Sequence, residues 1–332
     1  MSKSEYAIIM ASSKAYSFGL MASMNAQEFY GTNADWEIVY NTVEHSQAER
    51  EKISSSFKFN VSWTPIKELT DTIKLERTDG ATLEPDGMGW GMSYWLLAHR
   101  LLTEKKYKAV CVLQADSFPF VNLDTYLRIA ENGVLVTGEF AMTQSKVEDL
   151  PWGNDTIIVN RCQCPAFDSI NFLGQPHAIV AKDTVDMAIV NNKVDEDAHP
   201  VITYNRAIAR HCRREEVLGL DRHTWVCDNI WNDTILKESN NRIFNHLGIQ
   251  ICAWHARWWQ YGRVNGEWEN NRERLTNGKK HPDLLAGYER QEKNYTLVRD
   301  FMARFNNMKP EIASQLYVKD SLRRTRWEDG EV

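Results

Sequence analysis

Residues 109–114 (AVCVLQ) form a short apolar run that ends in the polar residues Asp116 and Ser117. A run of this length and character is typical of a strand buried on both faces of a parallel sheet. Similar runs, each followed by a segment with helical patterning, occur at residues 6–11 and 36–40. Because strands alternate with helices, the sequence predicts an α/β fold with a mostly parallel central sheet covered by helices.

The same patterns predict further elements along the rest of the chain. We expect strands at residues 59–63, 133–140, 155–160, 177–182 and 248–254. Helices are expected at residues 44–56, 92–106, 122–132, 183–191, 201–214, 225–238 and 283–307, and residues 262–282 are polar and predict a loop.

Composition excludes several classes of protein. The 332 residues contain no apolar run of about 18 residues, so we expect no membrane span. The apolar stretch at the N-terminus is too short for a signal peptide. The six cysteines include no CxxC pair, which favours buried thiols in a reducing cytoplasm, or in the host cytoplasm if the protein is viral. The absence of GxGxxG and P-loop motifs speaks against a Rossmann dehydrogenase or an NTPase.

The net charge of −6 is unevenly distributed. Residues 1–203 carry a net charge of −10, whereas residues 204–326 carry +7. A basic second half indicates an anionic partner, and a nucleic-acid backbone is one candidate. The basic residues also fit an ordinary solvated helix face, so both interpretations stay open. The densest basic cluster consists of Arg206, Arg210, Arg213 and Arg214.

The strongest single candidate for chemistry is Asp116, just beyond the carboxyl end of the predicted strand 109–114. Ligands of open α/β sheets bind at this edge. A carboxylate there is well placed to hold Mg²⁺ or Mn²⁺, which prefer oxygen ligands and bridge to phosphates. The alternative is an aspartate that only caps a helix or forms a turn.

The segment QADSF, followed by the NLD of residues 122–124, resembles the DxD region of GT-A nucleotide-sugar glycosyltransferases, particularly the retaining, glycogenin-like members. Asp116 matches the second, metal-binding Asp of that motif. The first acidic position is occupied here by Gln114, which offers an oxygen but no charge.

Two later segments extend the resemblance. Residues 224–236 (TWVCDNIWNDTIL) resemble the DQxxLN stretch of the family, which implies that Asp228 and Asn229 lie against the donor sugar. Residues 253–262 (AWHARWWQYG) resemble the late histidine segment, which implies that His255 joins Asp116 and Gln114 around the metal. His255 also suits an aromatic core, so that alternative stays open.

The nucleotide end of the site is implied by the first strand and by a glycine-rich loop. In the family, the end of the first strand holds uracil and ribose, which points to Ala11, Ser12 and Tyr16. Residues 86–94 (DGMGWGMSY) contain Trp90 and glycines that permit close approach of the backbone to the donor.

Taken as a whole, the resemblance implies a GT-A glycosyltransferase that uses Mn²⁺ or Mg²⁺ and a nucleotide-sugar, with UDP favoured. It implies a catalytic domain at residues 1–260, with a nucleotide-sugar-binding half at 1–140 and an acceptor half at 141–260. Residues 261–332 would form a polar loop and a helical extension. If the enzyme inverts the anomeric configuration of the transferred sugar, Asp228, Asp155 or Glu139 would act as the base that deprotonates the acceptor hydroxyl. A mechanism that retains this configuration needs no strong base.

The acceptor stays open at the level of sequence. Some phage-type glycosyltransferases modify hydroxymethylated bases in DNA, and the basic second half would suit a DNA acceptor. Two alternatives to a glycosyltransferase remain, namely a nucleotidyltransferase and a GT-A-like nucleotide-binding module without catalysis. The sequence predicts no oligomeric state.

Overall fold

The computed structural model describes residues 4–12, 17–70, 88–115, 117–136, 170–194, 200–221, 224–227, 234–255 and part of 289–304. The chain forms two compact units whose segments alternate along the sequence. The first unit comprises Met1–Ser13, Gly31–Ala115 and Asn122–Arg222, and the second comprises Lys14–Tyr30, Asp116–Val121 and His223–Val332. The predicted domain boundary near residue 260 stays a prediction.

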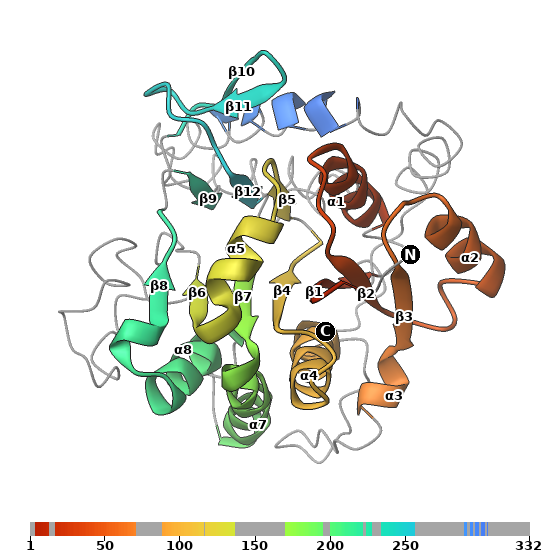
Figure 1. Cartoon of the computed structure of the whole chain (residues 1–332), viewed down its shortest axis with the longest axis vertical. Helices are drawn as coiled ribbons and strands as arrows, with labels where there is room; N and C mark the ends of the chain where they lie inside the picture. The colour runs from red at the N-terminus through yellow and green to blue at the C-terminus, as the bar shows by residue number, and fades with distance from the viewer. Residues whose placement is uncertain are drawn as a thin grey trace, which may run out of the picture. The chain divides into compact units, whose positions relative to one another are not determined.

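The first unit is built on a seven-stranded sheet with the order β3-β2-β1-β4-β7-β6-β8 (Figure 1). Neighbouring strands from β3 to β4 are parallel, β7 runs antiparallel to both β4 and β6, and β8 is parallel to β6. The predicted mixed, mostly parallel α/β sheet is therefore confirmed. Its strands are β1 (Tyr6–Ser12), β2 (Asp35–Tyr40), β3 (Val61–Pro65), β4 (Ala109–Leu113), β6 (Val134–Val136), β7 (Ile170–Gly174) and β8 (Val217–Gly219).

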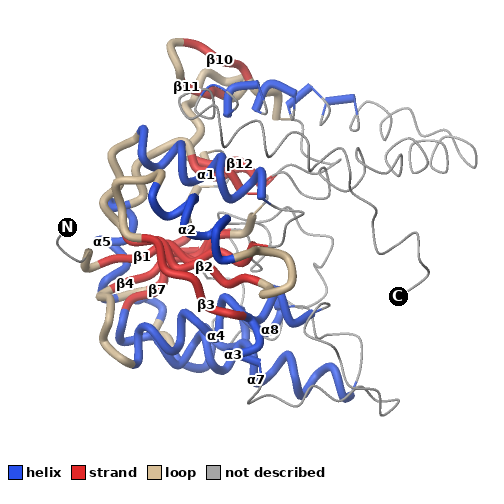
Figure 2. Tube along the Cα trace, turned by 90° about the vertical axis from the view of Figure 1, so that its right-hand side faces the viewer, coloured by secondary structure: helices blue, strands red, loops and turns tan. Residues whose placement is uncertain are grey.

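Helices cover both faces of this sheet. In Figure 2, α3, α4, α7 and α8 lie on one side, and α2 and α5 lie on the other. A capping box between Ser46 and Glu49 begins α2 and satisfies backbone N–H groups that would otherwise lack partners. The helices of this unit are α2 (Gln47–Ser55), α3 (Ile66–Thr70), α4 (Met88–Thr103), α5 (Asp124–Ile129), α7 (Ala178–Val194) and α8 (Pro200–His211), with short 3-10 turns at Ala130–Asn132, Gln175–His177 and Arg214–Glu216.

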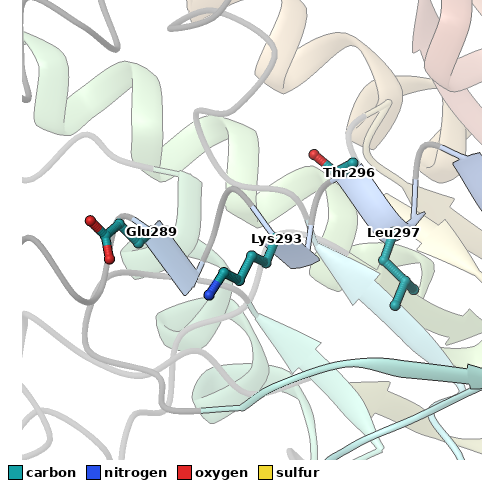
Figure 3. Close-up of a pocket in the computed structure, with 4 residues that line it drawn as sticks. All are labelled: Glu289, Lys293, Thr296 and Leu297. Atoms are coloured by element: carbon teal, nitrogen blue, oxygen red, sulfur yellow. The ribbon is translucent and has the colours of Figure 1, made fainter.

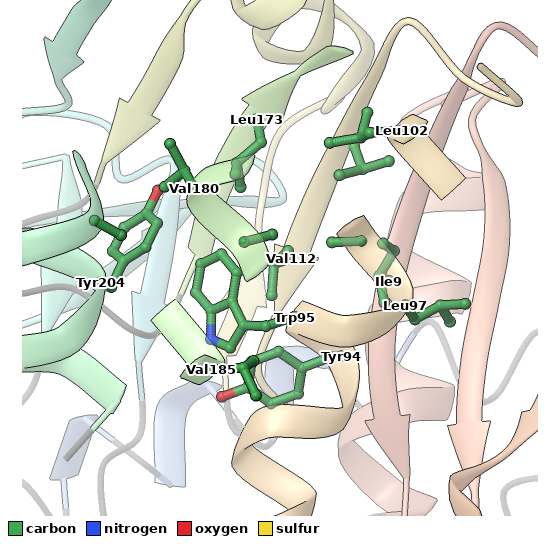
Figure 4. Packing of buried hydrophobic residues seen from close by; sticks show 14 of the residues in the cluster. Ile9, Tyr94, Trp95, Leu97, Leu102, Val112, Leu173, Val180, Val185 and Tyr204 are labelled. Carbon is green, nitrogen blue, oxygen red and sulfur yellow. The ribbon is translucent and has the colours of Figure 1, made fainter. Parts of the chain in front are cut away.

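The core of the first unit fills the space between the sheet and helices α4, α7 and α8 (Figure 4). Alternate residues of the central strands, such as Ile9 and Val112, point into this layer. Trp95 of α4 is fully buried there, with its ring 4.5 Å from that of Tyr204 of α8. This packing accounts for the continuous apolar face that the sequence shows over residues 92–106.

The second unit contains α1 (Ser17–Phe29), a three-stranded sheet and a hairpin. The sheet has the order β5-β12-β9, and β12 is antiparallel to β5 and parallel to β9. Its core includes residues of α1, of all three strands and of the helical residues at 289–304. The strands are β5 (Ser117–Pro119), β9 (Trp225–Cys227) and β12 (Ala253–His255), and the hairpin pairs β10 (Lys237–Ser239) with β11 (Arg242–Phe244).

Two predicted elements are wrong. The sequence predicts a strand at residues 177–182, but residues 178–182 begin α7, and the strand is β7 immediately before it. Short apolar runs do not distinguish a strand from a buried helix, and Pro176 marks the start of the helical segment. The helix expected at 225–238 is also wrong, because β9 and β10 occupy its two ends. Its central residues, like the strand expected at 155–160, lie outside the described residues.

Candidate functional site

One candidate region, in the first unit, is the carboxyl edge of β1, β2 and β4. Ser12 lies beside Tyr40 of β2, and the parallel register of β1 with β4 continues toward Ala11 and Gln114. Ser12 is fully buried, whereas Ala11 and Gln114 are half-buried and therefore retain access to solvent. The predicted residues Ala11, Ser12 and Gln114 thus lie at or just after the carboxyl ends of two neighbouring strands, on the edge where open α/β sheets bind ligands.

A separate candidate region, in the second unit, is organised by β12. His255 pairs with Ser117 across the antiparallel ladder and with Cys227 across the parallel one. Ser117 directly follows Asp116 in the sequence, and Cys227 directly precedes Asp228. One rung of this small sheet therefore joins three segments that the sequence analysis singled out separately.

The environment of His255 is defined by strand alternation. Phe118, Val226 and Trp254 point to one face and pack in the core of the second unit, with the rings of Phe118 and Trp254 6.2 Å apart. His255 and Ser117 occupy the alternate positions and so face the other side of the sheet. His255 is only 5% exposed. A histidine as buried as this fits both a metal ligand and a core residue, so both interpretations of His255 stay open.

Several predicted residues lie outside the described part of the chain. These residues are Tyr16, Asp116, Asp155, Asp228, Asn229 and Glu139. Trp90 lies in α4, Arg206 lies in α8 and Arg214 lies in a 3-10 turn, but their side chains are not described. Within the described residues, no group of three or more His, Cys, Asp and Glu side chains is arranged to hold a metal ion.

The hydroxyl oxygen of Ser117 is a buried polar atom of the kind that a divalent cation binds. The Ser117 hydroxyl is inaccessible to solvent and has no hydrogen-bond partner among the described residues. Sequence reasoning missed Ser117, because nothing in the letters ADSF distinguishes a buried strand serine from a turn serine. Its pairing with His255, 138 positions away in the sequence, makes it visible.

Two of the predicted nucleic-acid contacts are neutralised by neighbouring carboxylates. Arg210 lies 3.4 Å from Asp183, and Arg213 lies 2.9 Å from Glu216 and 3.2 Å from Glu215. Hydrogen bonds from Arg213 lower the pKa of Glu216, which keeps that carboxylate ionised beside the guanidinium. These arginines therefore present less net positive charge than their number in the sequence suggests.

A groove of about 510 Å³ lies along the helical residues near the C-terminus (Figure 3). Its described lining consists of Glu289, Lys293, Thr296 and Leu297, which share one helix face. The opposite face buries Val298, Phe301 and Met302 in the core of the second unit. The groove is thus a partly charged outer surface of a segment that the core holds in place.

No family model matches the chain, and no curated protein matches it. Solved structures that it resembles include the bifunctional glycosyltransferase WbbM, at 13% identity and a TM-score of 0.43 over 69% of this chain. This chain spans 40% of the WbbM chain. The galactosyltransferase LgtC, in complex with donor and acceptor sugar analogues, is 8% identical, with a TM-score of 0.44 over 75% of this chain and 86% of LgtC. Mouse xyloside xylosyltransferase 1 is 13% identical, with a TM-score of 0.41 over 68% of this chain and 87% of that one.

These likenesses are distant, with TM-scores below 0.5 and identities of 8 to 13%. None of the helices that the structure describes is long and apolar enough to cross a membrane.

Proposed function

We propose that this chain is a GT-A glycosyltransferase that transfers a sugar from a nucleotide-sugar, with UDP as the favoured nucleotide, to a hydroxyl acceptor. The observation that carries this proposal is the single rung Ser117–His255–Cys227 in the second unit. This rung brings His255 next to Ser117 and Cys227. Asp116 directly precedes Ser117 in the sequence, and Asp228 directly follows Cys227. Three segments that resemble the family's metal and donor-binding motifs are thus connected through one strand.

The donor set fits Mn²⁺ or Mg²⁺. Asp116 would supply a carboxylate, Gln114 a neutral oxygen and His255 an imidazole nitrogen, a combination that suits Mn²⁺ in particular. The buried Ser117 hydroxyl supports this fit, because it is an oxygen that the described residues leave without a hydrogen-bond partner. Such a cation, when bound, neutralises the charge that develops on the diphosphate leaving group.

The remaining predicted residues are assigned by the same proposal. Ala11, Ser12 and Tyr16 would hold the nucleoside, and Trp90 would lie near the donor. Asp228 and Asn229 would orient the donor sugar against the acceptor. If the configuration inverts, Asp228, Asp155 or Glu139 would take the proton of the acceptor hydroxyl.

The acceptor could be a hydroxymethylated base in DNA, as the basic second half of the chain suggests. The ion pairs of Arg210 and Arg213 do not favour this version, because both guanidinium groups already have carboxylate partners. An acceptor that is a protein or a glycan would instead use neutral polar contacts, for which the hydroxyl of Thr296 in the groove is suited. We place the reaction in the cytoplasm, or in the host cytoplasm for a viral protein, which suits the free thiols of Cys111 and Cys212.

Thermal-shift measurements with UDP and GDP, with and without Mn²⁺, test the donor half of the proposal. We expect a UDP shift that requires Mn²⁺ and that Asp116→Asn abolishes. Asp186→Asn is a matched control, because Asp186 lies exposed on α7 in an i,i+4 pair with Lys182. A protein with no shift for any nucleoside diphosphate would contradict the proposal.

Incubation with a panel of UDP-sugars and with plain or hydroxymethylated DNA, followed by mass analysis of the nucleosides, tests the acceptor. A hexose added only to hydroxymethylated DNA would establish the DNA version, whereas unchanged nucleosides would remove it. Hydrolysis of UDP-sugar to UDP without DNA modification would support transfer to another acceptor. Release of pyrophosphate from a nucleoside triphosphate and a sugar phosphate would instead identify a nucleotidyltransferase. Metal-dependent UDP binding without any turnover would identify a binding module.

A further inference from the structure

The hairpin of β10 and β11 turns one face to the core of the second unit and the other to solvent. Lys237 pairs with Phe244 across the ladder, and Ser239 pairs with Arg242, so these four residues project to one face. Ile243, at an alternate position, points to the opposite face and is fully buried in the core. Lys237, Ser239 and Arg242 are exposed, and Phe244 is half-buried. We call the face formed by these four residues the outer hairpin face.

The outer hairpin face carries two positive charges that keep their strength. Among the described residues, no carboxylate forms an ion pair with Lys237 or Arg242. Arg242 Nη1 instead donates to the neutral amide oxygen of Gln250, at 3.4 Å. The carboxylate of the hairpin, on Glu238, accepts hydrogen bonds from both Nη atoms of Arg304 on the opposite face. A cationic face without a carboxylate attracts an anionic partner.

One amide from the helical residues near the C-terminus holds the base of the hairpin in place. Asn294 Nδ2 donates to the carbonyl of Thr234 at 2.8 Å, and its Oδ1 accepts from the N–H of Leu236 at 2.9 Å. Asn294 is 1% exposed, so water does not compete for these bonds. At the other end, Asn240 and Asn241 have φ values of 51° and 57°, as a type I′ hairpin turn requires. The outer hairpin face is therefore preorganised, which lowers the entropy cost of binding.

We propose that the outer hairpin face is a docking surface for duplex DNA. In naming DNA as the acceptor, this inference rests on the proposed function. The major groove is about 12 Å wide and admits a two-stranded β-ribbon. Strands β10 and β11 have three residues each and so span about 10 Å, which fits this width. Lys237 and Arg242 contact phosphates, while the exposed amides of Asn240 and Asn241 form hydrogen bonds within the groove.

The other groups of this face favour a nucleic acid over an anionic lipid surface. A protein surface that binds lipid combines its cations with large apolar side chains that enter the bilayer. The neighbours of the two cations are instead the hydroxyl of Ser239 and the amides of the turn, and the ring of Phe244 is half-buried. Hydroxyl and amide side chains bind phosphate oxygens and sugars in protein–DNA interfaces. The exposed Leu247 lies beyond β11, in the following turn, so lipid is the alternative that the experiment has to include.

The salt dependence of DNA binding tests the outer hairpin face. The measurement is the fluorescence anisotropy of a labelled duplex between about 50 and 200 mM salt. Because each phosphate contact contributes about 0.9 to the slope of log affinity against log salt concentration, Lys237→Ala with Arg242→Ala should reduce that slope by about 1.8. Binding at low salt should weaken about tenfold or more. Lys237→Arg with Arg242→Lys keeps both charges and should keep the slope. An unchanged slope for the alanine variant would overturn the inference.

Lys108→Ala with Lys182→Ala is the matched control. It removes the same amount of charge from the first unit, where Lys108 pairs with Glu5 and Lys182 pairs with Asp186. We expect this control to bind duplex DNA with nearly the wild-type slope. Exposed substitutions of this kind change stability little, so all these variants should melt within about 2 °C of the wild-type protein. An equal loss of slope in the control would show that net charge governs DNA binding, and would overturn the role of the outer hairpin face.

Vesicles that contain phosphatidylserine test the lipid alternative. If the wild-type protein binds these vesicles through Lys237 and Arg242 but does not bind duplex DNA, the partner is a lipid surface and the inference is wrong. A wild-type protein that shows the Mn²⁺-dependent UDP shift without binding duplex DNA would also overturn the inference, while the proposed function stands. If duplex DNA binds through the outer hairpin face and no nucleoside diphosphate binds, the proposed function fails, and the face remains a DNA-docking surface without an acceptor role.

Discussion

The phenol of Tyr107 donates a hydrogen bond of 2.6 Å to Oε1 of Glu37 in the first unit. Glu37 is 2% exposed, and Lys106 Nζ lies 2.5 Å from the same oxygen. Tyr107 OH also lies 3.3 Å from Asp35. Asp35 lies at the amino end of β2, and therefore at the edge of the sheet opposite to the ligand-binding edge. The cluster thus stabilises the sheet without forming part of the candidate site.

Tyr107→Phe should destabilise the protein by about 1–3 kcal/mol, because the buried carboxylate of Glu37 loses a donor. The measurement is the shift in melting temperature. Tyr204→Phe is a matched control, because the phenol of Tyr204 is equally buried but has no partner among the described residues. Loss of that hydroxyl should be neutral or stabilising. Equal effects of the two substitutions would show that the bond to Glu37 contributes nothing specific.

The same bond predicts how stability depends on alkaline pH. Burial, followed by the hydrogen bond to Glu37, raises the pKa of Tyr107 well above its ordinary value of about 10. Above pH 10 the unfolded chain loses this proton and the folded protein retains it, so stability falls as pH rises. Between pH 9 and pH 11 the melting temperature of Tyr107→Phe should therefore fall less steeply than that of the wild-type protein. Parallel curves would contradict the role of Tyr107.

The strands of the α/β sheet were predictable where each carries its own signal. Residues 109–113 are apolar because β4 is central and buried on both faces, and the runs near β1 and β2 are apolar for the same reason. Strand β5 has three residues and exists only through its pairing with β12, so no local pattern reveals it. Tyr107 and Glu37 are likewise brought together by tertiary structure across 70 positions.

The candidate site could be predicted only as separate motifs. Asp116, Asp228 and His255 were proposed from three short resemblances, and the letters do not show that the three segments are neighbours. The register of β5, β12 and β9 supplies this connection. In the arginine cluster, the sequence instead overstates the positive charge. The carboxylate partner of Arg210 lies on another helix, so the segment around Arg210 does not reveal the ion pair.

Gly174→Ala should destabilise the first unit severely. A Cβ at this position would overlap the carbonyl oxygens of Ala130 and Glu131, which are backbone atoms that cannot rotate away. The N–H of Gly174 also bonds to Gly133 O at 2.9 Å, which holds the backbones together. We expect a loss of about 3 kcal/mol or more, measured as melting temperature or soluble yield.

Gly31→Ala separates steric overlap from backbone strain. Gly31 has a φ of 72°, but no heavy atom lies within 4 Å of the position that a Cβ would occupy. Its substitution should cost only about 1 kcal/mol, the penalty of a left-handed conformation. If Gly174→Ala proves no more harmful than Gly31→Ala, the close approach at Gly174 is not rigid.

Gln114→Asp should strengthen cation binding. Gln114 follows β4 and is half-buried, so a carboxylate there retains some hydration. The substitution restores the acidic residue that the family motif carries, and an added negative charge attracts a divalent cation. We expect Mn²⁺ affinity in the presence of UDP to rise about tenfold, and Gln114→Asn to leave it nearly unchanged. Weaker binding by Gln114→Asp would show that Gln114 does not face the cation.

Arg210 of α8 and Arg213, which follows that helix, should contribute little to any binding of DNA. A cation that contacts phosphate contributes about 0.9 to the slope of log affinity against log salt concentration. Because Arg210 and Arg213 are paired with Asp183 and Glu216, Arg210→Ala with Arg213→Ala should change that slope by much less than about 1.8. The combined substitutions Asp183→Asn, Glu215→Gln and Glu216→Gln should instead release both guanidinium groups and strengthen retention of duplex DNA at low salt. A drop of about 1.8 in slope for the arginine variant would mean that the ion pairs open when DNA binds, and would restore these arginines as part of an acceptor surface.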